Sequence, residues 1–221
     1  KIENDKNYDN YIIPGFVDLH CHGGKGCDSM EGLESINNMS LYHLLHGTTT
    51  LYPTTVTAEF KNTFKALKGL NKYLKINKNI SNIEGIHLEG PFINPDKLGA
   101  QPPFAQLPNK DFVKKLVEEA PIKIITLAPE LKNGIELIKF LVKNNIKPQI
   151  GHSLADYKCC MLAIKNGVKS ITHLYNAMTK FNHRKPGVIE AALNELKFTE
   201  IICDLIHVDK EMIKLASKNI D

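Results

Sequence analysis

Short runs of β-branched and aliphatic residues recur along this chain, and amphipathic helical patterns separate them. Such runs predict β-strands, while apolar residues at intervals of three and four predict helices. The seven expected strands cover residues 12–19, 48–56, 83–88, 122–127, 146–150, 170–172 and 200–203. Strands that alternate with helices are typical of parallel α/β folds, in which each helix connects two neighbouring strands.

The number of repeats favours a closed barrel over an open, doubly wound sheet. A doubly wound fold that binds dinucleotides needs a G-x-G-x-x-G turn after its first strand. The corresponding turn, residues 22–26, reads HGGKG and lacks that spacing. We therefore expect an α/β fold of the (β/α)8 TIM-barrel type.

The length predicts that the barrel is incomplete. A complete eight-fold barrel typically needs about 250 residues, and the chain has 221. We expect residues 12–221 to form strands one to seven, with strand eight missing. Residues 1–11 are expected to be the remnant of a small β-rich N-terminal segment.

Composition narrows the expected partners and location. No apolar run approaches the ~18 residues of a membrane span, and the polar N-terminus does not read as a signal peptide. The five cysteines include no C-x-x-C pair, which favours reduced thiols. Lysines are spread along the chain without a basic block. We expect a cytoplasmic protein that binds neither membrane nor nucleic acid.

Arginine usage singles out one position. Of the 28 basic residues, only Arg184 is an arginine. In a chain that uses lysine everywhere else, this indicates a chemical reason for the guanidinium group. Drift in a lysine-rich sequence is the alternative that composition leaves open.

Metal-binding side chains gather where the predicted strands end, which is where barrels of this type place their active sites. Five of the nine histidines and one carboxylate fall there: His20, His22, Glu89, His152, His173 and His207. Side chains alternate along a strand, so His20 and His22 point into the same space. Imidazole and carboxylate suit zinc, iron and other divalent ions, and we predict metal binding by His20, His22, Glu89, His152 and His173.

Three longer strings make the signal specific. They are PGFVDLHCH at 14–22, HLEGPF at 87–92, and GHS at 151–153 followed by THLYNAM at 172–178. Together with LAPE at 127–130 and RKPG at 184–187, their order resembles the amidohydrolase superfamily. The HLEGPF and HLYNAM strings resemble its N-acetylglucosamine-6-phosphate deacetylases. The resemblance extends from about residue 12 to the C-terminus.

The resemblance implies a function and a metal centre. The function is metal-dependent hydrolysis of the acetamide of N-acetyl-D-glucosamine 6-phosphate, which gives D-glucosamine 6-phosphate and acetate in amino sugar catabolism. Glu89, His152 and His173 match the main metal site, and His20 and His22 match a second site that some members keep. The resemblance thus implies one or two divalent ions, zinc, iron or manganese, in each subunit.

The resemblance also implies a substrate-binding set. Its members are Ala100, Gln101, Asn176, Ala177, Arg184, Asp204 and His207. Arg184 matches a phosphate-binding arginine that serves the neighbouring subunit in the family's dimers, so we expect a homodimer for the full-length protein. The small-molecule partner is an amino sugar phosphate.

Three departures from the family pattern matter. Gln101 stands where the family often has a histidine, and glutamine can donate a hydrogen bond but cannot carry charge. Leu205 stands where glycine is usual. The family's general acid is an aspartate at the end of strand eight, to which no residue here corresponds. The catalytic residue is therefore unknown, and we expect little activity from residues 1–221 alone.

Two other functions stay open at this point. One is an amidohydrolase that acts on a cyclic amide or a nucleobase. Those enzymes often bridge two metals through a modified lysine on strand four, and strand four here ends TLAP at 126–129, without a lysine. The other is a non-catalytic fragment that binds a metal or a sugar phosphate.

Overall fold

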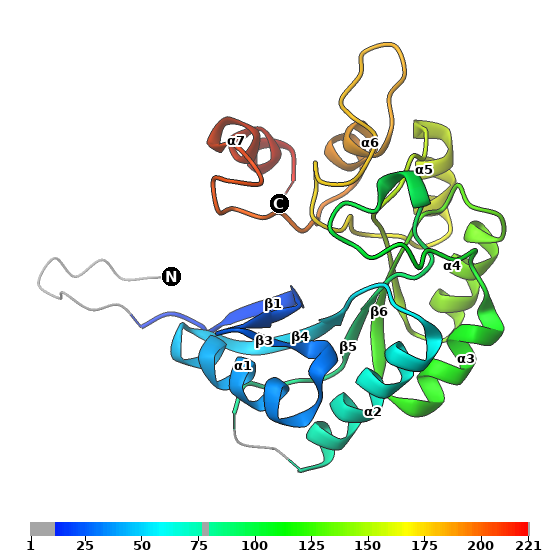
Figure 1. Cartoon of the computed structure of the whole chain (residues 1–221). Helices are drawn as coiled ribbons and strands as arrows, with labels where there is room; N and C mark the ends of the chain where they lie inside the picture. The colour runs from blue at the N-terminus through cyan, green and yellow to red at the C-terminus, as the bar shows by residue number, and fades with distance from the viewer. Residues whose placement is uncertain (1–11, 77–79, 221) are drawn as a thin grey trace, which may run out of the picture.

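A curled parallel sheet forms the centre of the molecule (Figure 1). The computed structural model describes residues 12–76 and 80–220, so the expected N-terminal remnant at 1–11 lies outside the described residues. The sheet has five strands in the order β1-β4-β5-β6-β7. They are β1 (Phe16–Cys21), β4 (Thr48–Thr55), β5 (Ile86–Glu89), β6 (Ile122–Leu127) and β7 (Lys147–Ile150). All neighbouring pairs are parallel, which confirms the predicted α/β barrel architecture over about half a barrel.

Helices such as α2, α3 and α4 cover the convex side of the curled sheet (Figure 1). The α-helices are α1 (Leu33–Leu45), α2 (Phe60–Ile76), α3 (Lys110–Glu119), α4 (Gly134–Lys143), α5 (Tyr157–Lys165), α6 (Val188–Glu195) and α7 (Lys210–Asn219). Two short 3-10 helices span Ser29–Glu31 and Pro95–Lys97. None of the helices in the described part of the chain is long and apolar enough to cross a membrane.

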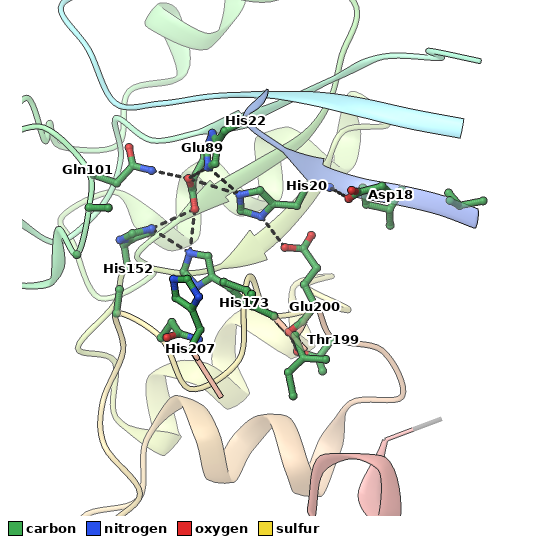
Figure 2. A pocket seen from close by; sticks show the side chains of 18 residues that line it. Asp18, His20, His22, Glu89, Gln101, His152, His173, Thr199, Glu200 and His207 are labelled. Carbon is green, nitrogen blue, oxygen red and sulfur yellow. Dashed lines mark hydrogen bonds and ion pairs between the residues drawn. The ribbon is translucent and has the colours of Figure 1, made fainter. Parts of the chain in front are cut away.

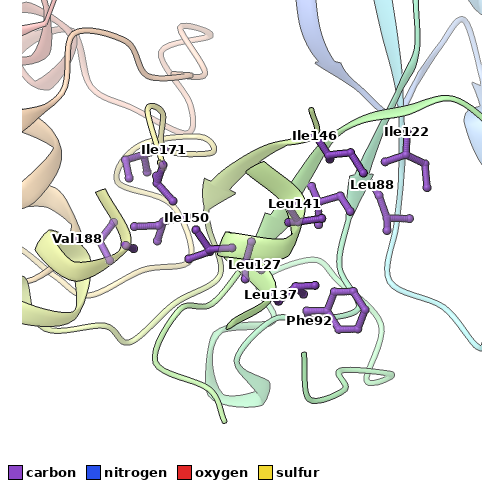
Figure 3. Close-up of a cluster of buried hydrophobic side chains, with 14 of the residues drawn as sticks. Leu88, Phe92, Ile122, Leu127, Leu137, Leu141, Ile146, Ile150, Ile171 and Val188 are labelled. Carbon is purple, nitrogen blue, oxygen red and sulfur yellow. The ribbon is translucent and has the colours of Figure 1, made fainter. Parts of the chain in front are cut away.

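The hydrophobic core lies between the sheet and these helices (Figure 3). Leu88, Leu127 and Ile150 project from three adjacent strands, and Leu137 and Leu141 meet them from α4. All five are at most 2% exposed. Burying a side chain of this size contributes roughly 1.5–3 kcal/mol. The core therefore fixes β5, β6 and β7 rigidly. Of the predicted metal ligands, Glu89 ends β5 and His152 follows shortly after β7.

The sixth and seventh predicted strands are wrong as strands. Residues 170–172 form only an isolated parallel bridge, between Ile150 and Ile171. Residues 200–203 have no strand assignment, although Glu200 N donates to Ile171 O at 2.9 Å. In the described part of the chain, the backbone bonds of this segment are those of Glu200 with Ile171 and Leu174, which are too few for a strand ladder. The chain still follows the barrel path and brings both segments to the site.

A small antiparallel hairpin was missed by the sequence analysis. It consists of β2 (Gly23–Gly24) and β3 (Cys27–Asp28) and follows β1 directly. Lys25 and Gly26 form its two-residue turn with φ angles of 54° and 74°. Such turns require positive φ at both positions, which glycine adopts freely. The hairpin returns the chain to His22, whose carbonyl accepts from Ser29 N at 2.8 Å.

Candidate metal centre

The structure brings the five predicted ligands together, with four imidazoles around the carboxylate of Glu89 (Figure 2). Glu89, at the end of β5, is 1% exposed. Its Oε1 lies 3.0 Å from His152 Nε2 and 2.9 Å from His173 Nε2. Its Oε2 lies 3.0 Å from His22 Nε2 and 3.6 Å from His20 Nε2. Each carboxylate oxygen therefore faces its own pair of imidazoles.

Hydrogen bonds at the far side of the rings fix which nitrogen faces Glu89 with a lone pair. His152 Nδ1 lies 2.8 Å from Lys97 O, and His22 Nδ1 lies 3.1 Å from Thr54 O. A carbonyl only accepts, so Nδ1 carries the hydrogen in both rings. In the neutral ring, Nε2 then points a lone pair at the carboxylate. Acceptor atoms that face one another need a cation between them.

The remaining contacts complete two ligand groups. His152 Nε2 and His173 Nε2 are 3.1 Å apart, as are His20 Nε2 and His22 Nε2. Within each group, the ligand atoms of two histidines and Glu89 lie within 4.8 Å of one another. Two imidazoles and a carboxylate oxygen form a typical ligand set for zinc or another divalent first-row ion. The residues thus fit two ions, with Glu89 contributing one oxygen to each.

The electrostatics of the centre keep Glu89 charged. Burial opposes the charged carboxylate, but hydrogen bonds from His152, His173, His20 and His22 outweigh it and hold the pKa of Glu89 well below its ordinary value. Burial also opposes the charged form of His20, yet bonds to Glu200 and Glu89 raise its pKa to about 10. Glu89 therefore stays charged, and a bound cation would take over the stabilisation that the imidazoles give it.

The backbone that carries two of the ligands is strained. His152 and His173 have φ angles of 49° and 32°, and Ala177 has 50°. Residues other than glycine rarely adopt positive φ, and each such position costs of order 1–3 kcal/mol. Ser153 N donates to Ala177 O at 3.2 Å, which ties the two strained loops together. Strain of this kind concentrates at functional sites, where the fold holds ligands in place.

The ligands open onto a cavity of about 720 Å³, which falls within the size range of small-molecule sites. Of the predicted substrate-binding residues, Ala100, Gln101, Asn176, Ala177 and His207 line it. Asp204 and Arg184 are not among its lining residues. Asp204 nevertheless belongs to the site indirectly, because its Oδ2 accepts from His207 Nδ1 at 2.7 Å. Backbone and side-chain hydrogen bonds from His207 lower the pKa of Asp204 to about 2.

Gln101 holds the central carboxylate. Its Nε2 donates to Glu89 Oε2, and its Oε1 accepts from Thr57 N at 2.6 Å. Both ends of the amide are thus bonded within the protein, and the side chain is buried. The family resemblance implied a substrate contact for Gln101, and the structure adds a supporting contact to Glu89.

Arg184 lies elsewhere, on the exposed loop that precedes α6. The loop projects away from the rest of the chain (Figure 1). Asn182 Oδ1 shapes it by accepting from the backbone N of Arg184 at 2.9 Å and of Lys185 at 3.0 Å.

His87 lies behind the centre and is a core histidine. Its Nδ1 donates to Leu19 O at 2.9 Å, and its Nε2 lies 2.7 Å from Thr126 Oγ1. It is fully buried, and burial lowers its pKa to about 4. Both ring nitrogens are engaged, so His87 does not join the ligands.

Two acidic residues contribute to the site without having been predicted to do so. Glu200 Oε2 lies 2.7 Å from His20 Nδ1. Glu130 accepts hydrogen bonds from Asn94, Ser153 and Leu154, and so fastens the loops after β5, β6 and β7 to one another. Nothing in the sequence near Glu200 indicated a partner 180 residues away.

Comparisons with known proteins place this centre in a family. The model of the Amidohydrolase family matches residues 11–220. The chain belongs to the amidohydrolase family. Its curated relatives include the N-acetylglucosamine-6-phosphate deacetylase of Bacillus subtilis (strain 168), at 40% identity over 216 residues, covering 94% of this chain and 54% of the relative. Another is the N-acetylgalactosamine-6-phosphate deacetylase of Escherichia coli O157:H7, at 30% identity over 210 residues, covering 93% and 56%.

Solved amidohydrolase structures agree with this assignment. The N-acetyl-D-glucosamine-6-phosphate deacetylase of Mycobacterium smegmatis superposes with a TM-score of 0.88 at 30% identity, covering 94% of this chain and 55% of that one. The N-acetylglucosamine-6-phosphate deacetylase of Thermotoga maritima gives 0.84 at 35% identity, covering 94% and 56%. The chain thus spans about half the length of the relatives that it matches.

Proposed function

We propose that this amidohydrolase hydrolyses the acetamide of N-acetyl-D-glucosamine 6-phosphate to D-glucosamine 6-phosphate and acetate. The observation that carries the proposal is Glu89, whose two oxygens each face a pair of imidazoles at the wall of a cavity. The substrate is inferred from the names of the relatives. Those names disfavour a nucleobase or cyclic-amide substrate, as does the absence of lysine from residues 126–129.

The chain would hold two divalent ions, which we take to be zinc, iron or manganese. His152 and His173 would bind one ion with Glu89 Oε1, and His20 and His22 the other with Glu89 Oε2. When bound, such an ion would lower the pKa of water at the site towards neutrality, so that a nucleophile is available at neutral pH.

The cavity residues would orient the substrate. His207 donates from Nδ1 to Asp204, which fixes its ring and leaves Nε2 for the acetamide or a sugar hydroxyl. Asn176 and the strained Ala177 line the same cavity from the loop after His173. Gln101 binds Glu89 through its amide, so we assign it the role of holding this carboxylate in line with both ligand groups.

The 6-phosphate would be bound by Arg184. A guanidinium group holds a phosphate through two parallel hydrogen bonds, which makes the only arginine of the chain its best candidate. The exposed, projecting position of Arg184 supports delivery to the site of a second subunit. We therefore include a homodimer in the proposal.

Acetate release tests the function. The full-length protein, loaded with zinc, iron or manganese, should release acetate from N-acetyl-D-glucosamine 6-phosphate. Its isomer N-acetyl-D-galactosamine 6-phosphate is tested as the alternative substrate. Glu89→Gln is the inactive reference, because it removes the charge shared by both ligand groups. Faster release from the galactosamine isomer would reassign the substrate. Metal-loaded protein that releases acetate from neither sugar would refute the proposal.

A further inference from the structure

Among the described residues, His20 is the one ligand whose outer ring nitrogen contacts a carboxylate (Figure 2). His152 and His22 use backbone carbonyls for this purpose, at Lys97 and Thr54. His173 Nδ1 is buried and has no hydrogen-bond partner in the described part of the chain. Glu200 Oε2, in contrast, lies 2.7 Å from His20 Nδ1. The two ligand groups therefore differ in what supports them.

We infer that Glu200 is a positioning residue that fixes the His20 ring and thereby sets the affinity of the His20–His22 group for its ion. This inference rests on the proposed metal centre. A carboxylate can only accept, so His20 Nδ1 donates and Nε2 of the neutral ring keeps its lone pair for the metal. Carboxylate partners of this kind orient the ring and make it more basic, and their loss typically costs 10–100-fold in metal affinity.

The backbone of Glu200 keeps its side chain in place. Glu200 N donates to Ile171 O at 2.9 Å, and Leu174 N donates to Glu200 O at 2.8 Å. These two bonds flank His173, so the main chain of Glu200 braces one ligand group while its side chain reaches the other. The carboxylate is 15% exposed and cannot move freely into solvent. Replacing the side chain alone should therefore disturb the His20–His22 group and spare the His152–His173 group.

Glu200 could instead be a ligand of a third ion, together with His20 and His87, whose ligand atoms also lie within 4.8 Å of one another. Two contacts argue against this. Both ring nitrogens of His87 are already engaged, by Leu19 O and Thr126 Oγ1. His20 would also have to use Nδ1 for the third ion and Nε2 for the second. A role of Glu200 as a hydrogen-bond partner of His20 accounts for the same short distances without a third ion.

Zinc binding to the metal-free protein tests the inference without any substrate. Wild type, Glu200→Gln and Glu118→Gln would be titrated by calorimetry and their bound zinc counted after gel filtration. Glu118 is the matched control, an exposed glutamate on α3. We expect two zinc ions in wild type and in the control. In Glu200→Gln, the affinity for one ion should fall 10- to 100-fold and that for the other should stay unchanged.

Four results would overturn the inference: a single ion in wild type, a third ion that depends on Glu200, unchanged binding in Glu200→Gln, or an equal loss of both ions. Glu200→Asp, which keeps the charge but shortens the reach, guards against a folding defect. It should retain the two-ion count with a smaller loss of affinity, and equal loss of both ions there too would identify a purely structural role. Acetate release by wild type is measured separately. Its absence beside the expected zinc result would refute the deacetylase and leave the role of Glu200 intact.

Discussion

The carboxylate of Glu130 accepts a hydrogen bond from the hydroxyl of Ser153 at 2.7 Å, directly beside the predicted metal ligand His152. The same carboxylate accepts from Leu154 N at 2.6 Å and from Asn94 Nδ2 at 2.9 Å. Asn94 N in turn donates to His152 O at 2.9 Å. Glu130 therefore holds the backbone of His152 in its left-handed conformation from two sides, although it has no contact with the predicted metal ligands themselves.

Glu130→Ala should destabilise the protein and lower the metal affinity of the His152–His173 group. Hydrogen bonds to a charged group contribute about 1.5–3 kcal/mol, so the free energy of unfolding should fall by about 2–3 kcal/mol in urea titrations. Glu136→Ala, at an exposed position on α4, is the control and should change it little. Equal stability of Glu130→Ala and wild type would show that water replaces the bonds without loss.

The shared carboxylate predicts a graded pattern of metal loss. Glu89→Gln should lose both ions, because each ligand group uses one of its oxygens. His152→Ala and His173→Ala should each lose the ion of the His152–His173 group. His22→Ala should lose the ion of the His20–His22 group, since sites with three protein ligands have no spare donor. Metal counted after dialysis separates these cases. Full retention of bound metal in both the His152→Ala and the His173→Ala variants would refute the assignment of these two histidines as ligands.

Gln101→Leu should lower the free energy of unfolding, because it removes both hydrogen bonds of the Gln101 amide. The change leaves Thr57 N without its partner and removes the support of Glu89 Oε2. A buried donor that loses its partner costs about 1–3 kcal/mol, which urea unfolding of the metal-free protein would measure. Gln101→His, the residue often found in the family, is the informative comparison. If both variants matched wild type in stability and zinc affinity, Gln101 would have no supporting role.

The buried His87 predicts acid sensitivity of the metal-free protein. Its pKa is lowered from 6.5 to about 4 in the folded state. The unfolded chain therefore takes up a proton first, and the stability contributed by neutral His87 is lost as the pH falls from about 6.5 towards 4. Between pH 7 and pH 5 this amounts to about 2 kcal/mol.

His87→Gln should remove that part of the pH dependence. Urea unfolding of both proteins at pH 7 and at pH 5 gives the difference, and the contributions of the other titrating groups cancel in the comparison. An identical pH dependence in wild type and variant would mean that His87 does not become charged on unfolding in this range.

Parts of this fold and site follow from the sequence because they are local. Alternation of apolar runs and helical patterns predicts β1, β4, β5, β6 and β7, although the ends shift by up to four residues, as at Phe16. The candidate ligands could be found because each has a metal-binding side chain at the end of a segment whose sequence predicts a strand. Asp204 and His207 lie three residues apart, so their contact is local too.

The contacts that sequence could not predict join distant segments. Glu200 reaches His20 across 180 residues, and Gln101 reaches Thr57 across 44. No periodicity relates such pairs, since only the closed path of the sheet brings them together. The two segments predicted as strands at 170–172 and 200–203 fail for a related reason. Strand formation depends on a continuous ladder of hydrogen bonds to a neighbouring segment, and local propensity does not report it.

Arg184→Lys should separate phosphate binding from the rest of recognition. Lysine keeps the charge but loses the paired hydrogen bonds of the guanidinium group. Because charge-assisted bonds contribute about 1.5–3 kcal/mol, the KM for N-acetyl-D-glucosamine 6-phosphate should rise roughly 10- to 200-fold. The kcat should stay close to that of wild type, and unphosphorylated N-acetyl-D-glucosamine should be turned over as before.

Lys185→Gln is the matched control, because it removes a neighbouring exposed charge from the same loop. It should change the KM far less than Arg184→Lys, since a general electrostatic effect of the loop is small at ordinary salt. Delivery of Arg184 to a second subunit adds one further expectation. An Arg184→Lys subunit paired with a Glu89→Gln subunit retains one intact site, assembled from the Glu89 of one chain and the Arg184 of the other. Mixing the two variants should therefore restore phosphate-dependent turnover, and no recovery in verified mixed dimers would place Arg184 at the site of its own chain.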